Sequence, residues 1–212
     1  MEPDELTRKQ LQLIHPEKLY QYLPNVNDQT LGALFGLSEA DYRATKAHFS
    51  NQIQEVLKEL LADPSMSAQA YRLPFQDNDV VLALGESHTD DALSWFNILQ
   101  TLVEQISPEK HIRFLNMAVS GHTTTAALRQ FTSHLLYKPT WIFCMLGVND
   151  SLRIGINPGK TLVSRSETQR NLVYMRQLAA QANVGHWVWL TPTPIIEAAQ
   201  SNNHWFRQMQ LS

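Results

Sequence analysis

The sequence predicts an α/β fold: a three-layer α/β/α arrangement around a parallel sheet, preceded by a helical N-terminal extension. From residue 79 onward, short apolar runs alternate with segments of helical periodicity, which is the order of βαβ units. The apolar runs are continuous, as expected of parallel strands that helices cover on both faces. Residues 1–75 show helical periodicity and no strand pattern. We therefore expect a helical extension over residues 1–75 and an α/β domain over residues 76–212.

The N-terminal extension is expected to contain several short helices and one long one. Pro16 and Pro24 divide its first part into short pieces. A longer helix is predicted to begin at Ser38, which can cap it, and to end at Asp63-Pro64. Its predicted apolar stripe consists of Tyr42, Phe49, Ile53, Val56, Leu57 and Leu60. A lid, an oligomer contact and a plain extension all remain open as its role.

The α/β part is expected to contain four strands, at residues 80–84, 112–119, 141–146 and 186–190. Helices are predicted between them at residues 91–105, 125–136 and 167–181. A further helix is predicted after the fourth strand, at residues 195–211. The sequence shows no internal repeat.

The chain has 212 residues, which is enough for one core of ordinary size. Hydrophobic residues make up 43% and charged residues 17%, a composition typical of a soluble globular protein. A net charge of −3 without a basic cluster argues against nucleic-acid binding. No apolar run approaches the ~20 residues that span a bilayer, and the N-terminus lacks the features of a signal peptide. We therefore expect a cytoplasmic protein. The single cysteine, Cys144, is expected to be an inert buried thiol.

Polar residues and glycines follow three of the predicted strands, in Gly85-Glu-Ser87, Asn116-Met-Ala-Val-Ser-Gly121 and Gly147-Val-Asn149-Asp150. In a parallel sheet these ends lie along one edge, so the segments can converge. Their residue types suit acyl transfer, in which Ser87 supplies the nucleophile. The backbone N–H groups of Ser87 and Gly121 and the side-chain amide of Asn149 could donate hydrogen bonds to the oxyanion.

These segments resemble the three leading motif blocks of the SGNH (GDSL-like) hydrolase family, with a glutamate in Gly85-Glu-Ser87 where the family has an aspartate. Leu190-Thr-Pro-Thr-Pro194 is similar to the stretch that follows the family's fourth strand. The resemblance covers residues 79–194. It implies a flavodoxin-like fold, Ser87 as nucleophile, Gly121 and Asn149 as oxyanion donors, small-molecule ester substrates, and no metal or organic cofactor.

One block of the family is missing, namely the Asp-x-x-His that supplies the general base and its orienting carboxylate. No aspartate or glutamate of this chain has a histidine three residues later. His204 is the one histidine after the fourth predicted strand, and no acid precedes it at that spacing. We therefore expect the C-terminal part of the fold, with its base, to lie beyond Ser212.

Other interpretations of the same residues remain open. Ser87 could cap the helix that follows it, and Gly121 and Asn149 could be turn residues. A metal site at the neighbouring acids and histidines lacks any recognised ligand spacing. No G-x-G-x-x-G follows the first strand, which counts against a dinucleotide-binding domain, and Ser87 lacks the G-x-S-x-G elbow of α/β-hydrolases. The leading hypothesis is a serine hydrolase of carboxylic esters; the alternative is a remnant that binds a ligand or partner without turnover.

Overall fold

The structure, a computed structural model, describes residues 3–19, 26–154 and 159–193. Four strands in these residues form one parallel sheet of order β2-β1-β3-β4. They are β1 (Val80–Gly85), β2 (Arg113–Asn116), β3 (Trp141–Met145) and β4 (His186–Trp189). The predicted parallel α/β fold is confirmed. The helix predicted at residues 195–211, and His204, lie outside the described residues.

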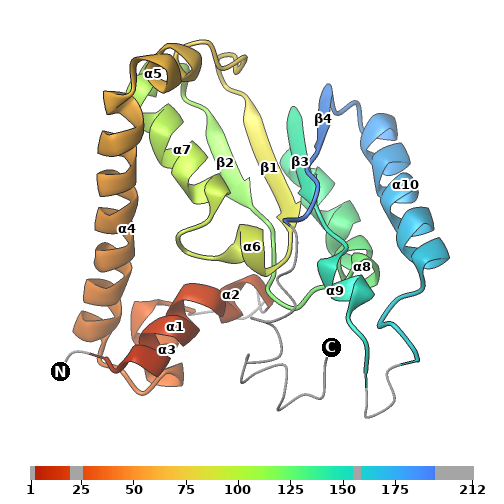
Figure 1. Ribbon diagram of the computed structural model, residues 1–212, viewed down its shortest axis with the longest axis horizontal. Coiled ribbons are helices and arrows are strands. Elements are labelled where there is room, and N and C mark those ends of the chain that lie inside the picture. Colours follow the sequence, from red (N-terminus) through yellow and green to blue (C-terminus); the bar gives the residue numbers. More distant parts are fainter. Residues whose placement is uncertain (1–2, 20–25, 155–158, 194–212) are drawn as a thin grey trace.

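Helices cover both faces of this sheet and give the predicted three layers (Figure 1). Helix α7 (Trp95–Ile106) covers one face, while α8 (Thr124–His134) and α10 (Arg165–Gln181) cover the other. Successive side chains of β1 point to opposite faces, so β1 contributes to both cores. Its Val81 and Ala83 share a buried cluster with Phe96 and Val103, and its Leu82 and Leu84 share another with Phe131 and Met175.

Short helical turns occupy the connections. They are α6 (Ser87–Asp90), η1 (Pro108–Lys110), η2 (Leu135–Tyr137) and α9 (Val148–Ser151). The helix predicted from residue 91 begins at Trp95 instead, because Ser94 forms its N-cap and accepts a hydrogen bond from the backbone N–H of Asn97 at 3.4 Å. Strand β2 is also shorter than the predicted range of residues 112–119. Beyond its end, the backbone N–H of Met117 still donates to the carbonyl of Ala83 in β1.

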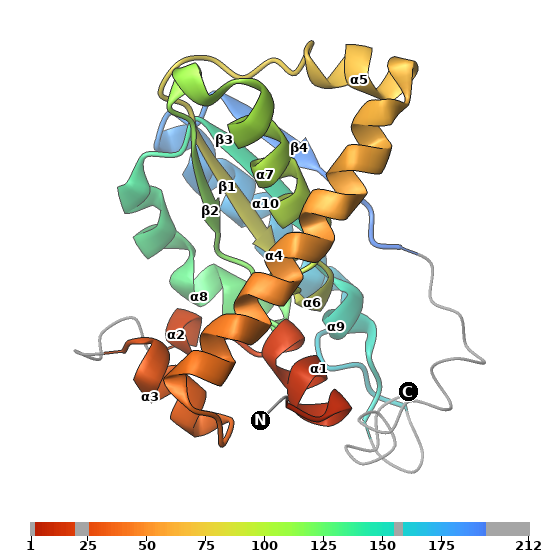
Figure 2. The ribbon, with the colours of Figure 1, turned by 90° about the vertical axis from the view of Figure 1, so that its left-hand side faces the viewer.

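The N-terminal helices are α1 (Glu5–Leu13), α2 (Pro16–Leu19), α3 (Asp28–Leu34), α4 (Glu39–Ala62) and α5 (Pro64–Ala70). Helix α4 begins after Ser38 as predicted, and the Ser38 hydroxyl accepts the N–H of Asp41 at 3.1 Å. It crosses the outer side of α7 (Figure 2), where Ile53 and Leu57 cluster with Leu102. The predicted stripe was wrong at Val56, which is 43% exposed. The domain division at residue 75 stays a prediction.

The strand order fixes where a ligand can bind. From β1 the chain moves to β2 on one side, and it then returns past β1 to β3 on the other side. Ligands of open parallel sheets bind outside the carboxyl ends of the strands at such a switch point. Helices α6 and α9 follow those ends of β1 and β3, and α1, α2 and α3 lie beyond the same edge (Figure 1).

Cys144 is buried in β3, as expected, and burial raises the pKa of its thiol. Among the described helices, none combines the length and the apolar character that crossing a bilayer requires.

Candidate active site

Ser87 is the first residue of α6, and only Glu86 separates it from the end of β1. Its carbonyl accepts the backbone N–H of Asp91 at 2.9 Å, which closes the turn of α6. Its side chain is partly buried, and no described residue hydrogen-bonds to its hydroxyl. Its backbone N–H also lacks an acceptor in the described part of the chain, as is usual in the first turn of a helix. Both groups of Ser87 are therefore available to a ligand at the strand end.

Gly85 allows α6 to begin so close to the sheet. A Cβ at this position would lie 2.5 Å from both Cβ and Oγ1 of Thr89, closer than real Cβ atoms come. Thr89 is fully buried, and its Oγ1 accepts the indole N–H of Trp95 at 3.2 Å, so it cannot easily move away. The glycine is thus required by the packing of α6 on β1, and it sets the position of Ser87.

Gly85→Ala is therefore expected to lower the free energy of unfolding by about 1–3 kcal/mol, the usual cost of overpacking a core. Urea unfolding checks this value. Gly185→Ala is the matched control, because a Cβ there meets only the Thr140 carbonyl oxygen at 3.7 Å, an ordinary contact. Equal stabilities of the two variants would show that α6 does not pack on β1 in this way.

Glu86 joins the end of β1 to the end of β3. Its side chain is almost fully buried, and its two carboxylate oxygens accept the backbone N–H groups of Val148 and Asn149, each at 2.9 Å. A carboxylate also suits the positive end of the α9 dipole. Burial raises the pKa of Glu86, and the two N–H donors oppose that rise. Glu86 thereby fixes the backbone of Asn149 relative to that of Ser87, a role that the sequence did not reveal.

Gly121 and Asn149 lie in the two neighbouring strand-end loops. Gly121 is exposed and has a φ of +82°, a conformation that side chains disfavour, and a Cβ there would meet no heavy atom within 4 Å. Its N–H has no acceptor in the ranges that the structure describes. The amide of Asn149 donates one hydrogen to the His122 carbonyl at 2.9 Å, which leaves its second hydrogen for another acceptor.

Asp150 connects the β3 end to two helices on one face of the sheet. Its buried carboxylate accepts the backbone N–H of Thr124 at 2.8 Å, the Thr124 hydroxyl at 2.5 Å and the Thr168 hydroxyl at 2.8 Å. Thr124 begins α8 and Thr168 belongs to the first turn of α10. Asp150 therefore holds both helix starts against the strand end, in addition to any role in its own turn.

Asp90 is the third buried carboxylate of this edge. Its Oδ1 accepts the ring Nδ1–H of His15 at 2.9 Å and the ammonium of Lys18 at 2.5 Å, and its Oδ2 accepts the backbone N–H of Ser120 at 2.7 Å. Burial raises the pKa of Asp90, but the hydrogen bond from His15 and the charge of Lys18 outweigh it and lower that pKa to about 2. The carboxylate is therefore ionised at neutral pH.

This lowered pKa predicts an acid-dependent contribution to stability. The pKa falls from 3.8 to about 2 on folding, which corresponds to about 2–3 kcal/mol at about 1.4 kcal/mol per unit. A group with a lowered pKa contributes fully above its unfolded pKa, and the contribution is lost as the pH falls from about 4 through about 2. The difference in urea-unfolding free energy between the wild-type chain and Asp90→Asn is expected to shrink over that range. A difference that stays constant with pH would contradict this assignment.

The described histidines do not supply an evident base. None of them hydrogen-bonds to Ser87, and His88 is exposed. His122 follows Gly121, and burial lowers its pKa, an effect that Asp90 opposes and Arg129 reinforces. His204 lies outside the described residues. Within those residues, no group of three histidine, cysteine or acidic side chains is arranged to hold a metal ion.

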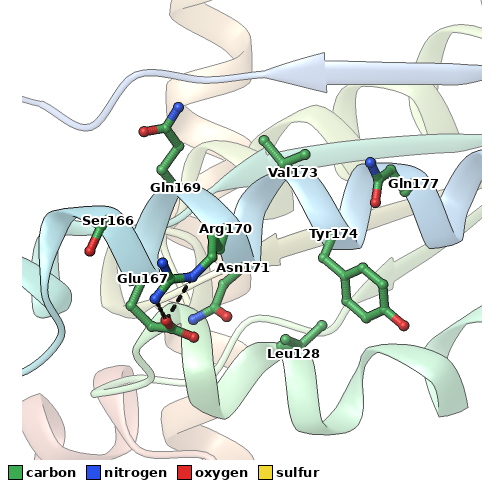
Figure 3. Close-up of a pocket in the computed structure, with 9 residues that line it drawn as sticks. All are labelled: Leu128, Ser166, Glu167, Gln169, Arg170, Asn171, Val173, Tyr174 and Gln177. Carbon is green, nitrogen blue, oxygen red and sulfur yellow. Dashed lines mark hydrogen bonds and ion pairs between the residues drawn. The ribbon is translucent and has the colours of Figure 1, made fainter.

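Two hollows on the described surface lie away from Ser87. One, of about 630 Å³, is an open groove between α8 and α10, where Tyr174 extends beside Leu128 and Arg170 pairs with Glu167 (Figure 3). The other, of about 330 Å³, lies between the N-terminal helices and α6–α7, and His15, Lys18 and Asp90 contribute to its wall. None of Ser87, Gly121 and Asn149 lines either hollow.

The structure thus brings the three predicted strand-end loops together. Glu86, beside Ser87, bonds to the backbone of Asn149, and the side chain of Asn149 bonds to the residue after Gly121. The catalytic roles of Ser87, Gly121 and Asn149 stay predictions. Sequence reasoning missed the linking roles of Glu86 and Asp90. For Glu86 the available signal was an acidic residue next to a continuously apolar strand, because a carboxylate in such a place must find buried donors.

Comparison with known proteins gives partial likenesses. No protein-family profile matches the chain. An uncharacterized lipoprotein of Bacillus subtilis, YqeF, is 30% identical over 128 residues, which are 55% of this chain and 49% of that protein. The chain therefore spans about half the length of the curated relative it matches. Because that relative is named a lipoprotein, the cytoplasmic location of this chain stays a prediction.

Solved structures of esterases have a similar arrangement. A catalytic mutant of Axe2, an acetylxylan esterase from Geobacillus stearothermophilus, aligns with a TM-score of 0.49 at 19% identity, over 65% of this chain and 68% of that one. AlinE4, an SGNH-hydrolase family esterase, aligns with a TM-score of 0.41 at 26% identity, over 53% of this chain and 58% of that one. The activity named in each case belongs to that protein.

Proposed function

We propose that the chain carries the nucleophile and oxyanion site of a serine hydrolase that acts on small-molecule carboxylic esters. The observation that carries the proposal is the strand-end arrangement around Ser87. Among the described residues, the Ser87 hydroxyl at the carboxyl end of β1 has no partner, the N–H groups of Ser87 and Gly121 have no acceptor, and the Asn149 amide uses one of its two hydrogens. The resemblance of the three motif blocks to SGNH hydrolases supports the same reaction class.

In the proposed reaction, the Ser87 oxygen attacks the ester carbonyl carbon and gives its proton to a base. The carbonyl oxygen becomes an oxyanion, which accepts hydrogen bonds from the N–H groups of Ser87 and Gly121 and from the Asn149 amide. Collapse of this intermediate breaks the ester bond, releases the alcohol and leaves an acyl group on Ser87. Water then attacks the acyl group, and the carboxylic acid leaves.

The side chain that donates at position 149 is a neutral amide. Glu86 and Asp150 are buried beside it as carboxylates that already accept several hydrogen bonds. An asparagine amide donates a hydrogen bond without adding a further charge to this crowded edge. Neutral esters therefore suit the site better than substrates with a negative charge next to the carbonyl group.

General-base hydrolysis also requires a histidine within hydrogen-bonding distance of the Ser87 hydroxyl, and no described histidine occupies that position. The alternative function is accordingly ligand binding without turnover. It would use the same strand-end groups to bind a carbonyl compound, without any activation of Ser87.

Two measurements on the same preparation distinguish these functions. Hydrolysis of nitrophenyl acetate and nitrophenyl butyrate is followed by absorbance, with a Ser87→Ala preparation purified in parallel as the background. Binding of an N-alkyl acetamide, which has the carbonyl group of the ester but does not react, is followed by calorimetry. Turnover above the Ser87→Ala background supports the hydrolase. Acetamide binding without turnover supports the alternative, and the absence of both contradicts a ligand site at this edge.

A further inference from the structure

Asp90 is the point where three segments that are distant in sequence meet. His15 lies between α1 and α2, Lys18 lies in α2, and Ser120 belongs to the loop after β2. All three donate hydrogen bonds to the one buried carboxylate, Ser120 through its backbone N–H. The Lys18 ammonium donates in addition to the carbonyl oxygen of Ala118 at 3.0 Å. The N-terminal helices therefore contact α6 and the β2–α8 loop at the same place.

A second contact fixes the segment just beyond α6. The side-chain amide of Gln12 donates to both oxygens of the Asp91 carboxylate, at 2.9 and 3.0 Å. The carbonyl oxygen of Gln12 accepts the backbone N–H of Ala92 at 2.8 Å. Three consecutive residues after Thr89 are thus held by α1 and α2.

These contacts lie next to both halves of the proposed site. Asp90 follows Ser87 by three residues in the single turn of α6, and Ser120 directly precedes Gly121. The bond from the Ser120 N–H to Asp90 therefore relates the nucleophile's turn to the loop that carries an oxyanion donor. The acceptor of this bond is a buried carboxylate, and the cation of Lys18 and the hydrogen bond from His15 stabilise its charge.

We propose that Lys18 and His15 are positioning residues of the ester-hydrolysing site, which act through Asp90 to set the distance between Ser87 and Gly121. The proposal rests on the proposed function. Neither residue touches the reacting atoms: both lie in the wall of the hollow between the N-terminal helices and α6–α7, which Ser87 and Gly121 do not line. Helices α1 and α2 are then part of the site, which answers the open question of what the N-terminal segment does.

The kinetic consequence follows from geometry. A nucleophile and an oxyanion donor must converge on one carbonyl group, and a misplacement of about 1 Å can cost about 10² in rate. Loss of the Lys18 cation is therefore expected to lower kcat by about 10–100-fold. KM is expected to change by less than about 2-fold, because a positioning residue contributes little to ground-state binding.

The test uses Lys18→Met in the full chain, with Lys18→Arg to restore the cation and its donors. Lys9→Met is the matched control, because Lys9 is an exposed lysine of the neighbouring α1. The first measurement is hydrogen exchange of the Ser120 amide, which donates to Asp90, by NMR, relative to the amides of β3. The second is kcat and KM for nitrophenyl acetate.

In Lys18→Met, we expect faster exchange at Ser120 with β3 unchanged, together with the fall in kcat. Lys18→Arg is expected to restore both, and Lys9→Met is expected to leave both at their wild-type values. Unchanged exchange and unchanged kcat in a folded Lys18→Met overturn the proposal. A fall in kcat that equals the loss of folded protein, with no selective change in exchange, also overturns it.

Asp90→Asn keeps the test decisive if Lys18→Met does not fold, because it removes the charge without leaving a buried carboxylate unpaired. In Asp90→Asn we expect the same faster exchange at Ser120 and the same fall in kcat as in Lys18→Met. If both stay at their wild-type values, the proposal is overturned. The exchange measurement needs no turnover. If the wild-type chain shows no turnover but the exchange changes as expected, only the hydrolase function is contradicted. If the wild-type chain does turn over and Lys18→Met leaves kcat unchanged, only the positioning role is contradicted.

Discussion

Replacement of Ser87 by alanine is expected to lower the rate of ester hydrolysis by about 10³-fold or more. Removal of the nucleophile from a serine hydrolase costs up to about 10⁶ in kcat, and the residual rate comes from the oxyanion donors and from binding. In this chain the alanine would remove the side chain alone. The backbone N–H of residue 87 and the bonds of Glu86 to α9 would remain. Binding of a non-reacting ester analogue should therefore persist.

The measurement is the steady-state rate with nitrophenyl acetate, at matched concentrations of folded protein. Ser133→Ala is the control, because Ser133 is an exposed serine near the end of α8 whose hydroxyl donates only to the Gln130 carbonyl. It should hydrolyse at the wild-type rate. A Ser87→Ala variant that retains that rate would eliminate Ser87 as the nucleophile.

Asn149→Ala carries the second largest expected effect, a fall in kcat of about 10²–10³ with little change in KM. One donor to a developing oxyanion contributes about that much, because its hydrogen bond strengthens only as the charge forms. The substitution also leaves the His122 carbonyl without the donor it has at 2.9 Å. Asn149→Asp keeps the size of the side chain, but it has no N–H to donate and adds a negative charge next to the developing oxyanion. We expect Asn149→Asp to be slower still.

Asn51→Ala, at an exposed position of α4, is the control for the loss of an asparagine and should have wild-type kinetics. Thermal melts of all variants confirm that folded protein is compared. An Asn149→Ala variant that raises KM while kcat stays unchanged would place Asn149 in substrate binding and not in oxyanion stabilisation.

The sheet was predictable because its strands are continuous apolar runs that end in glycine or polar turns. The runs at residues 80–84 and 141–146 correspond to β1 and β3 within one residue. The short helix α6 was not predictable, because a four-residue helix has no periodicity of its own. It depends on the close approach of Gly85 to Thr89, a contact that becomes visible only when the chain is folded.

The location of the site followed from the sequence, whereas the groups that hold it together did not. The topology of a parallel sheet brings the three strand ends to one edge, so the convergence of those loops required no long-range information. The partners of Asp90 come from residues 72 and 75 positions earlier in the chain. No local pattern encodes such a contact, and the sequence therefore left a lid, an oligomer contact and a plain extension open as the role of the helical N-terminal segment.

The central claim is that Ser87 is an activated nucleophile, and covalent labelling with a fluorophosphonate tests it most directly. Attack by the serine oxygen forms a P–O bond and releases fluoride, so intact-mass spectrometry detects the adduct and peptide mapping locates it. We predict one adduct per chain, on Ser87, formed in proportion to the loss of ester hydrolysis and absent from Ser87→Ala. An unlabelled wild-type chain, or an adduct on another serine with Ser87 unmodified, would contradict the claim.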